Sequence, residues 1–156
     1  RQRRNADIRG SDLFFLNSLH SHNGQRTIEE TEFLVSTCRG SAEKITGIFS
    51  FLGYCKSDHP KVHGESVSIK TIANRLSFCG LDHIMLFDLH KSQIAYYFTT
   101  HLGPLKGVDH IYLMRQLIEF AQKELDFECI AGLDDGSYKR NALIARYVGC
   151  KNVVFV

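Results

Sequence analysis

The stretch FDLHKSQ places two side chains that could bind a metal, Asp88 and His90, directly after the apolar run HIMLF. A charged group at the end of a buried strand is costly to desolvate unless it has a partner. In open parallel sheets, the carboxyl ends of the strands are where ligands bind. The pair therefore predicts a metal and phosphate site, although solvated loop residues often show the same spacing.

Two other apolar runs, 44–53 and 127–133, also end in polar residues. Carboxylates beside the free N–H groups of a helix start suit a phosphate or a metal–phosphate pair. Mg²⁺ takes one or two carboxylates together with waters and phosphate oxygens, so it fits better than Zn²⁺. The polar residues are Lys56, Ser57 and Asp58 after the first run, and Asp134, Asp135, Gly136, Ser137, Lys139 and Arg140 after the second.

Each set has a plainer interpretation. The letters DDGS are equally typical of a helix N-cap with turn chemistry. Residues 53–66 have no hydrophobic period and could form only a surface loop. It is the occurrence of three such sets at predicted strand ends that favours a functional site.

Apolar runs alternate with amphipathic stretches along the chain. Thr27 with Glu30 predicts a capping box, and Gly80 predicts a helix C-cap. Nearly continuous apolar strands between helices predict an α/β fold, a doubly wound and mostly parallel sheet with helices on both faces. We expect strands at 12–17, 44–53, 83–88, 127–133 and 152–156, and helices at 27–41, 67–80, 91–98, 108–126 and 135–149.

The composition excludes several classes of protein. A net charge of +2 over 156 residues is too small to indicate nucleic acid binding. The sequence has no run of about 18 apolar residues, so we expect no membrane span. Five widely spaced cysteines without a CxxC pair predict reduced thiols. These features favour a cytoplasmic location, while the basic start RQRRNADIRG leaves a mitochondrial one as the alternative.

The stretches KITGIFSFLGYCKSD, VSIKTIANRLSFCGLDHIMLFDLHKSQI and DDGSYKR, taken in order, resemble the ribose-phosphate pyrophosphokinase family, the PRPP synthetases. Members carry a P-Y-A-R-Q-D loop, a D-L-H-x-x-Q-I strand end and a P-D-x-G-G-x-K-R turn. The resemblance covers nearly the whole chain. It implies a phosphoribosyltransferase-like fold of type I, with residues 1–156 forming the first domain of the family and the start of the second.

The resemblance also implies chemistry. Family members transfer pyrophosphate from ATP to ribose 5-phosphate with Mg²⁺, and they form oligomers. The implied partners are therefore homologous subunits or a larger assembly, with ATP, ADP or phosphate as ligands. The implied metal site is His90 and Asp134 with Asp88, the implied regulatory phosphate site is Arg9, and the implied nucleotide and phosphate site is Lys56, Ser57, Asp58, Asp135, Gly136, Ser137, Lys139 and Arg140.

Several residues depart from the family pattern. Lys56 and Ser57 stand where the family has Arg and Gln, and of the R-Q-D part of that loop only Asp58 remains. Lysine is a point charge and cannot replace the planar two-pronged contact that arginine makes with phosphate. Ser137 stands where the family has its second glycine, so a Cβ opposes close approach of the backbone.

The given sequence starts after the family's adenine-contacting loop and stops before its catalytic Lys and Arg and its ribose-phosphate loop. We therefore expect a noncatalytic subunit with a structural or regulatory role, and an active enzyme with missing ends is the alternative. In the first case, the aromatic residues Tyr96, Tyr97 and Phe98 are candidates for an interface.

Overall fold

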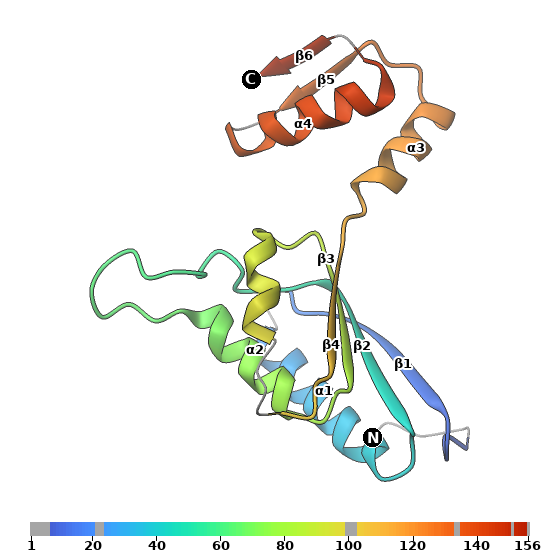
Figure 1. Cartoon of the computed structure of the whole chain (residues 1–156), viewed down its shortest axis with the longest axis vertical. Helices are drawn as coiled ribbons and strands as arrows, with labels where there is room; N and C mark the ends of the chain where they lie inside the picture. Colours follow the sequence, from blue (N-terminus) through green and yellow to red (C-terminus); the bar gives the residue numbers. More distant parts are fainter. Residues whose placement is uncertain (1–6, 21–23, 99–102, 133–134, 151, 156) are drawn as a thin grey trace. The chain divides into compact units, whose positions relative to one another are not determined.

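The computed structural model describes residues 7–20, 24–98, 103–132, 135–150 and 152–155. The chain divides into two compact units, residues 1–111 and 112–156 (Figure 1). Unit 1 contains β1 (Asp12–Ser18), α1 (Gly24–Arg39), β2 (Lys44–Phe51), α2 (Ser68–Phe78), β3 (His83–Phe87), the 3₁₀ helix η1 (Ser92–Phe98) and β4 (Gly107–Ile111). Unit 2 contains α3 (Met114–Glu124), β5 (Cys129–Gly132), α4 (Asp135–Val148) and β6 (Asn152–Phe155).

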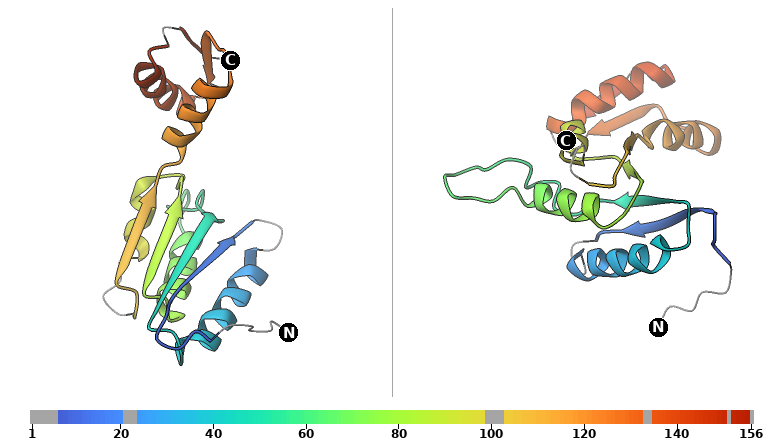
Figure 2. Two further views of the ribbon diagram at one scale, coloured as in Figure 1. Left: turned by 90° about the vertical axis from the view of Figure 1, so that its right-hand side faces the viewer. Right: turned by 60° about the horizontal axis from the view of Figure 1, so that its bottom comes forward.

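Unit 1 is built on a parallel four-stranded sheet in the order β1-β2-β3-β4, and unit 2 holds the parallel pair β5-β6. The predicted α/β class is confirmed. Helices α1 and α2 lie on the same side of the unit 1 sheet (Figure 2), and their apolar residues form one core with alternate residues of the strands. On β1 the opposite alternation leaves Phe14 58% and Leu16 72% exposed. Among the described residues, no helix is long and apolar enough to cross a membrane.

Two predicted boundaries were wrong. Residues 108–111 were predicted as the start of a helix, but they belong to β4 (Gly107–Ile111), paired in register with His83–Phe87 of β3. The pairing partner lies 24 residues earlier in the chain, so local periodicity could not reveal it. Helix α1 begins at Gly24, so Thr27 lies inside the helix and cannot cap it. The cap at Gly80 is supported by its φ of +110° directly after α2.

The starts of β2 and β3 are fixed by Asp82, whose side chain is 5% exposed. One carboxylate oxygen accepts the backbone N–H of Ile45 at 2.9 Å. The guanidinium of Arg39, at the end of α1, donates to both oxygens, and Lys106 lies 3.8 Å away. Burial acts to raise the pKa of Asp82, but these donors together lower it.

The chain turns out of β2 at Gly53, where the backbone comes close to the end of β1. A Cβ at this position would lie 2.5 Å from the carbonyl oxygen of Leu19. Gly53→Ala is therefore expected to lower the free energy of unfolding by about 1–3 kcal/mol, because a backbone carbonyl cannot move aside. Urea unfolding measures the change. Gly40→Ala is the control, since a Cβ there meets no atom within 4 Å, and an equal loss in both variants would contradict the clash.

Candidate functional site

The loops that follow β2 and β3 meet at the carboxyl ends of the unit 1 strands. Lys91 Nζ lies 2.8 Å from Oδ2 of Asp58, and the hydroxyl of Tyr97 donates to the Asp58 carbonyl at 2.8 Å. The structure thus brings together two of the three predicted sets, residues 56–58 and residues 88–90. Parallel strands place their carboxyl ends at one edge, which explains the meeting.

Each of the four residues from Asp88 to Lys91 is tied to a different neighbour. The N–H of Asp88 donates to the carbonyl of Ile111 at 3.0 Å. The N–H of Leu89 donates to Nε2 of His110 at 3.1 Å. The backbone of His90 hydrogen-bonds to the sulfur of Cys55, and Lys91 pairs with Asp58.

These ties leave the side chains of Asp88 and His90 exposed, while Leu89 between them is 7% exposed. We refer to residues 88–91 as the DLHK segment. Its backbone is fixed to both neighbouring strand ends, and its two candidate ligand side chains face solvent.

Both strand ends contain a residue in the left-handed conformation that is not glycine. Tyr54 follows β2 with φ of 65°, and Asp88 follows β3 with φ of 42°. Such a conformation costs about 1–3 kcal/mol and persists only where surrounding contacts impose it. Residues of this kind cluster at ligand sites, so their presence at these two strand ends favours a ligand site over a solvated loop.

Asp58 is the acidic residue at the centre of the junction, and it is 2% exposed. The hydrogen bond from Lys91 lowers its pKa most, burial opposes this, and His59 Nδ1 at 2.7 Å adds to the lowering. The resulting pKa is about 2. The carboxylate is therefore ionised at neutral pH, paired with the Lys91 ammonium and in contact with Nδ1 of His59.

The low pKa predicts how stability depends on acid. Because the pKa of Asp58 is lower in the folded than in the unfolded chain, its contribution is complete above about pH 4. That contribution is lost as the pH falls to about 2. The stability difference between the wild type and Asp58→Asn should stay constant from pH 7 to about 5 and close below about 4. Urea unfolding at several pH values measures it, and a difference independent of pH would contradict the ion pairs.

Cys55 lies in the same junction and is no nucleophile at neutral pH. Burial raises the pKa of its thiol to about 11, only partly offset by the hydrogen bond from the backbone of His90. The thiolate is the reactive form of cysteine. The five cysteines are unpaired. Thiol chemistry therefore does not explain the junction.

The described residues offer few ligands for a metal ion. Within the described ranges, no three His, Cys, Asp or Glu side chains lie close enough together to hold one. Asp58 is engaged by Lys91 and His59, and the exposed candidate ligands at this junction are Asp88 and His90. That set fits Mg²⁺ only as an ion that keeps most of its waters and shares the rest with phosphate oxygens.

The other predicted site residues are Arg9 in unit 1 and the third set, which belongs to unit 2. Asp134 lies outside the described residues. Helix α4 begins at Asp135, so Gly136, Ser137, Lys139 and Arg140 belong to its first turns, as the strand–turn–helix pattern predicted. Their role as a phosphate site stays a prediction. Arg9 is exposed, and its guanidinium donates to the carboxylate of Asp7, with the shortest bond 2.6 Å long.

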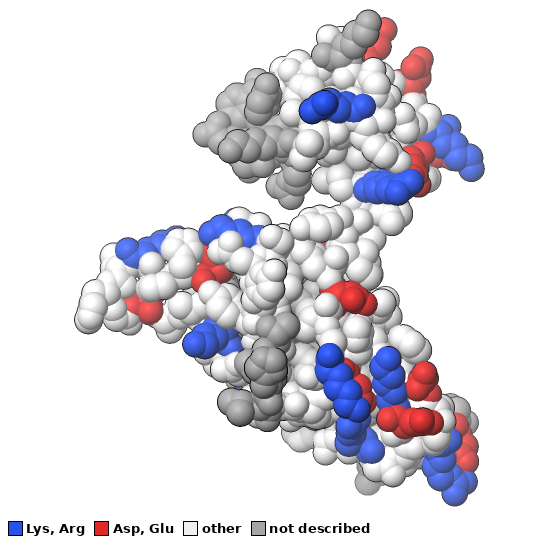
Figure 3. Space-filling model, viewed as in Figure 1, with Lys and Arg blue, Asp and Glu red and all other residues white. Residues whose placement is uncertain are grey.

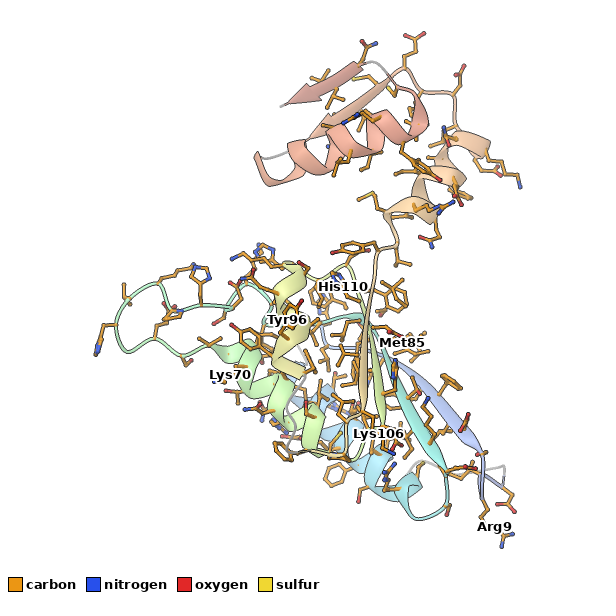
Figure 4. All side chains as sticks on the ribbon, viewed as in Figure 1. Arg9, Lys70, Met85, Tyr96, Lys106 and His110 are labelled. Atoms are coloured by element: carbon orange, nitrogen blue, oxygen red, sulfur yellow. The ribbon has the colours of Figure 1, made fainter. Side chains whose placement is uncertain are left out.

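The aromatic cluster divides into three different environments. Tyr96 is 77% exposed (Figure 4), whereas Phe98 is fully buried in the core. Tyr97 is partly buried and bonds to the loop of Asp58. Of the three, Tyr96 is the exposed candidate for an interface, and the prediction for Phe98 was wrong because its side chain is buried in the core of unit 1.

Two residues of the junction were not predicted from the sequence. Lys91 directly follows the predicted pair Asp88 and His90. A lysine next to two candidate ligands was a signal in the sequence that could have identified it. His110 was assigned to a helix, so its place at the end of a strand was hidden. Lys56 and Lys61 are exposed on the loop between β2 and α2, where Figure 3 shows basic and acidic side chains mixed.

Comparison with known proteins decides the family. The sequence pattern of the N-terminal domain of ribose phosphate pyrophosphokinase matches residues 1–80, which is half of the chain. This chain belongs to the ribose-phosphate pyrophosphokinase family. Ribose-phosphate pyrophosphokinase of Corynebacterium glutamicum is 32% identical over 151 residues, which cover 96% of this chain and 45% of the relative. The enzyme of Gloeobacter violaceus is 30% identical over 141 residues, or 89% of this chain and 40% of the relative.

A solved structure shows the same fold. The crystal structure of phosphoribosylpyrophosphate synthetase from Mycobacterium smegmatis matches with a TM-score of 0.80 at 28% identity. The match covers 98% of this chain and 50% of that one. The ribose-phosphate pyrophosphokinase fold therefore extends through both units, and the chain spans about half the length of the proteins it matches.

Proposed function

We propose that this chain is a PRPP synthetase-like subunit that does not make PRPP and that serves as a structural or regulatory component of an oligomer or larger assembly. Binding of a Mg²⁺-nucleotide or of phosphate without turnover is part of the proposal. The partners would be homologous subunits. The unpaired cysteines support a reducing compartment such as the cytoplasm.

The observation that carries the proposal is the state of the loop after β2. Asp58 is what remains of the R-Q-D part of the family motif, and it is buried and paired with Lys91 and His59. The neighbouring Lys56 is exposed, but it lacks the fork that holds a phosphate by two bonds. Transfer between phosphates depends on positioning and on groups that neutralise the developing charge. A loop with these two changes positions the phosphates less firmly and neutralises less of the developing charge.

An active ribose-phosphate diphosphokinase is the second candidate, and one observation favours it. The DLHK segment is tied to both neighbouring strand ends and presents Asp88 and His90 to solvent. A site that has lost its function has no need of two left-handed residues. If this candidate is right, Lys56→Arg with Ser57→Gln should raise the affinity for Mg·ATP, because the two-pronged phosphate contact returns.

The structural role is tested by the mass of the native assembly. Light scattering after size-exclusion chromatography, on the full polypeptide as its cell makes it, should give a mass greater than that of one chain. Adding a catalytic PRPP synthetase subunit of the same cell should produce a mixed particle. A polypeptide that stays monomeric alone and in the mixture would contradict the proposal.

A further inference from the structure

Strand β4 contributes a histidine to the backbone of the DLHK segment. His110 is paired in register with Leu86 of β3, so it lies on the same sheet face as that core residue. Its Nε2 atom accepts the N–H of Leu89 at 3.1 Å. A ring nitrogen that accepts a hydrogen bond carries no proton, so the proton of the neutral ring is on Nδ1. Figure 4 shows His110 where β4 leaves the sheet.

The bond acts at the centre of the segment. Leu89 lies between the two exposed candidate ligands, and its own side chain is held in the core. Its N–H is therefore the group that fixes the direction of the backbone as it passes from Asp88 to His90. The residue before it has φ of 42°, a conformation that side chains rarely adopt without support from neighbouring contacts.

We propose that His110 is a positioning residue: by accepting the N–H of Leu89, it sets the placement of Asp88 and His90 for a phosphate-bearing ligand bound with a divalent cation. The ligand class is that of the proposed function, on which this part rests. His110 itself need not touch the ligand. It acts through the backbone, as residues behind a metal site orient the groups that bind the ion.

Two substitutions separate the hydrogen bond from the bulk of the side chain. His110→Leu fills similar space and removes the acceptor. His110→Gln restores an acceptor, because the amide oxygen of glutamine reaches about as far as Nε2. His83→Leu is the matched control, since the His83 ring lies in the same sheet but bonds to Asp109 at 2.9 Å.

The first readout is amide hydrogen exchange of Leu89, compared with that of Lys106, whose N–H donates to the Asp82 carbonyl. We expect exchange of the Leu89 amide to rise about tenfold or more in His110→Leu relative to Lys106. His110→Gln and His83→Leu should stay near the wild type. Because Lys106 reports the stability of the sheet, a variant that is merely destabilised changes both amides. Equal changes in His110→Leu would overturn the proposal.

The second readout is the affinity of the full polypeptide for Mg·ADP, measured by calorimetry. His110→Leu should weaken binding about tenfold, and His110→Gln should recover it to within about twofold. Unchanged affinity in His110→Leu, or no recovery with glutamine, would overturn the positioning role. A wild type that binds no Mg·ADP would overturn the ligand assignment, whether or not the polypeptide joins a larger assembly. The proposed function is tested separately by mass and by turnover.

Discussion

Asp82→Ala is expected to lower the free energy of unfolding by about 3 kcal/mol, because it removes a buried carboxylate with several donors. The Ile45 N–H would lose its acceptor, and leaving a buried donor without one costs about 1–3 kcal/mol. Arg39 would lose both of its bonds to Asp82, although at 39% exposure it can partly hydrate. Urea unfolding at neutral pH measures the loss.

Asp109→Ala provides the matched control for this prediction. Asp109 lies on β4 and pairs with His83, but its side chain is 53% exposed. Exposed ion pairs contribute about 0–1 kcal/mol, so this variant should lose little. A loss for Asp82→Ala no larger than that for Asp109→Ala would contradict the role given to Asp82 at the starts of β2 and β3.

The second large effect concerns turnover. The full polypeptide, given Mg·ATP and ribose 5-phosphate, is expected to release AMP at least about a hundredfold more slowly than the Corynebacterium glutamicum relative. Loss of one preorganised group that stabilises transition-state charge commonly costs about that factor. Here Lys56 replaces a forked contact, and Asp58 is occupied by Lys91 and His59. The comparison is the triple variant Lys56→Arg, Ser57→Gln, Lys91→Ala. It restores the arginine and glutamine of the family motif and removes the lysine that pairs with Asp58.

The strands and helices were largely predictable because their hydrophobic periods are clear. Strand β3 and helix α2 lie within two residues of the predicted ranges. Strand β4 was missed because Ile111 falls on the helical stripe of Met114 and Ile118, and only the pairing with β3 shows that it belongs to a strand. The hydrophobic pattern of a short segment does not reveal a neighbouring strand that is distant in the sequence.

The candidate site was only partly predictable for a similar reason. The motif singled out Asp88 and His90 as candidates, and the apolar run 44–53 predicted that residues 56–58 would also follow the end of a strand. The ion pair of Asp58 with Lys91 and the bond from Leu89 to His110 depend on side-chain placement between strands, which spacing along one strand does not determine.

The most direct test is AMP release from ATP and ribose 5-phosphate by the full polypeptide as its cell makes it. The Corynebacterium glutamicum relative, assayed at the same Mg²⁺ concentration, sets the scale. For the wild-type polypeptide without any other subunit, we predict that AMP forms no faster with ribose 5-phosphate than without it. AMP and PRPP formed in equal amounts, at a rate within about tenfold of the relative, would contradict the noncatalytic account and establish an active synthetase.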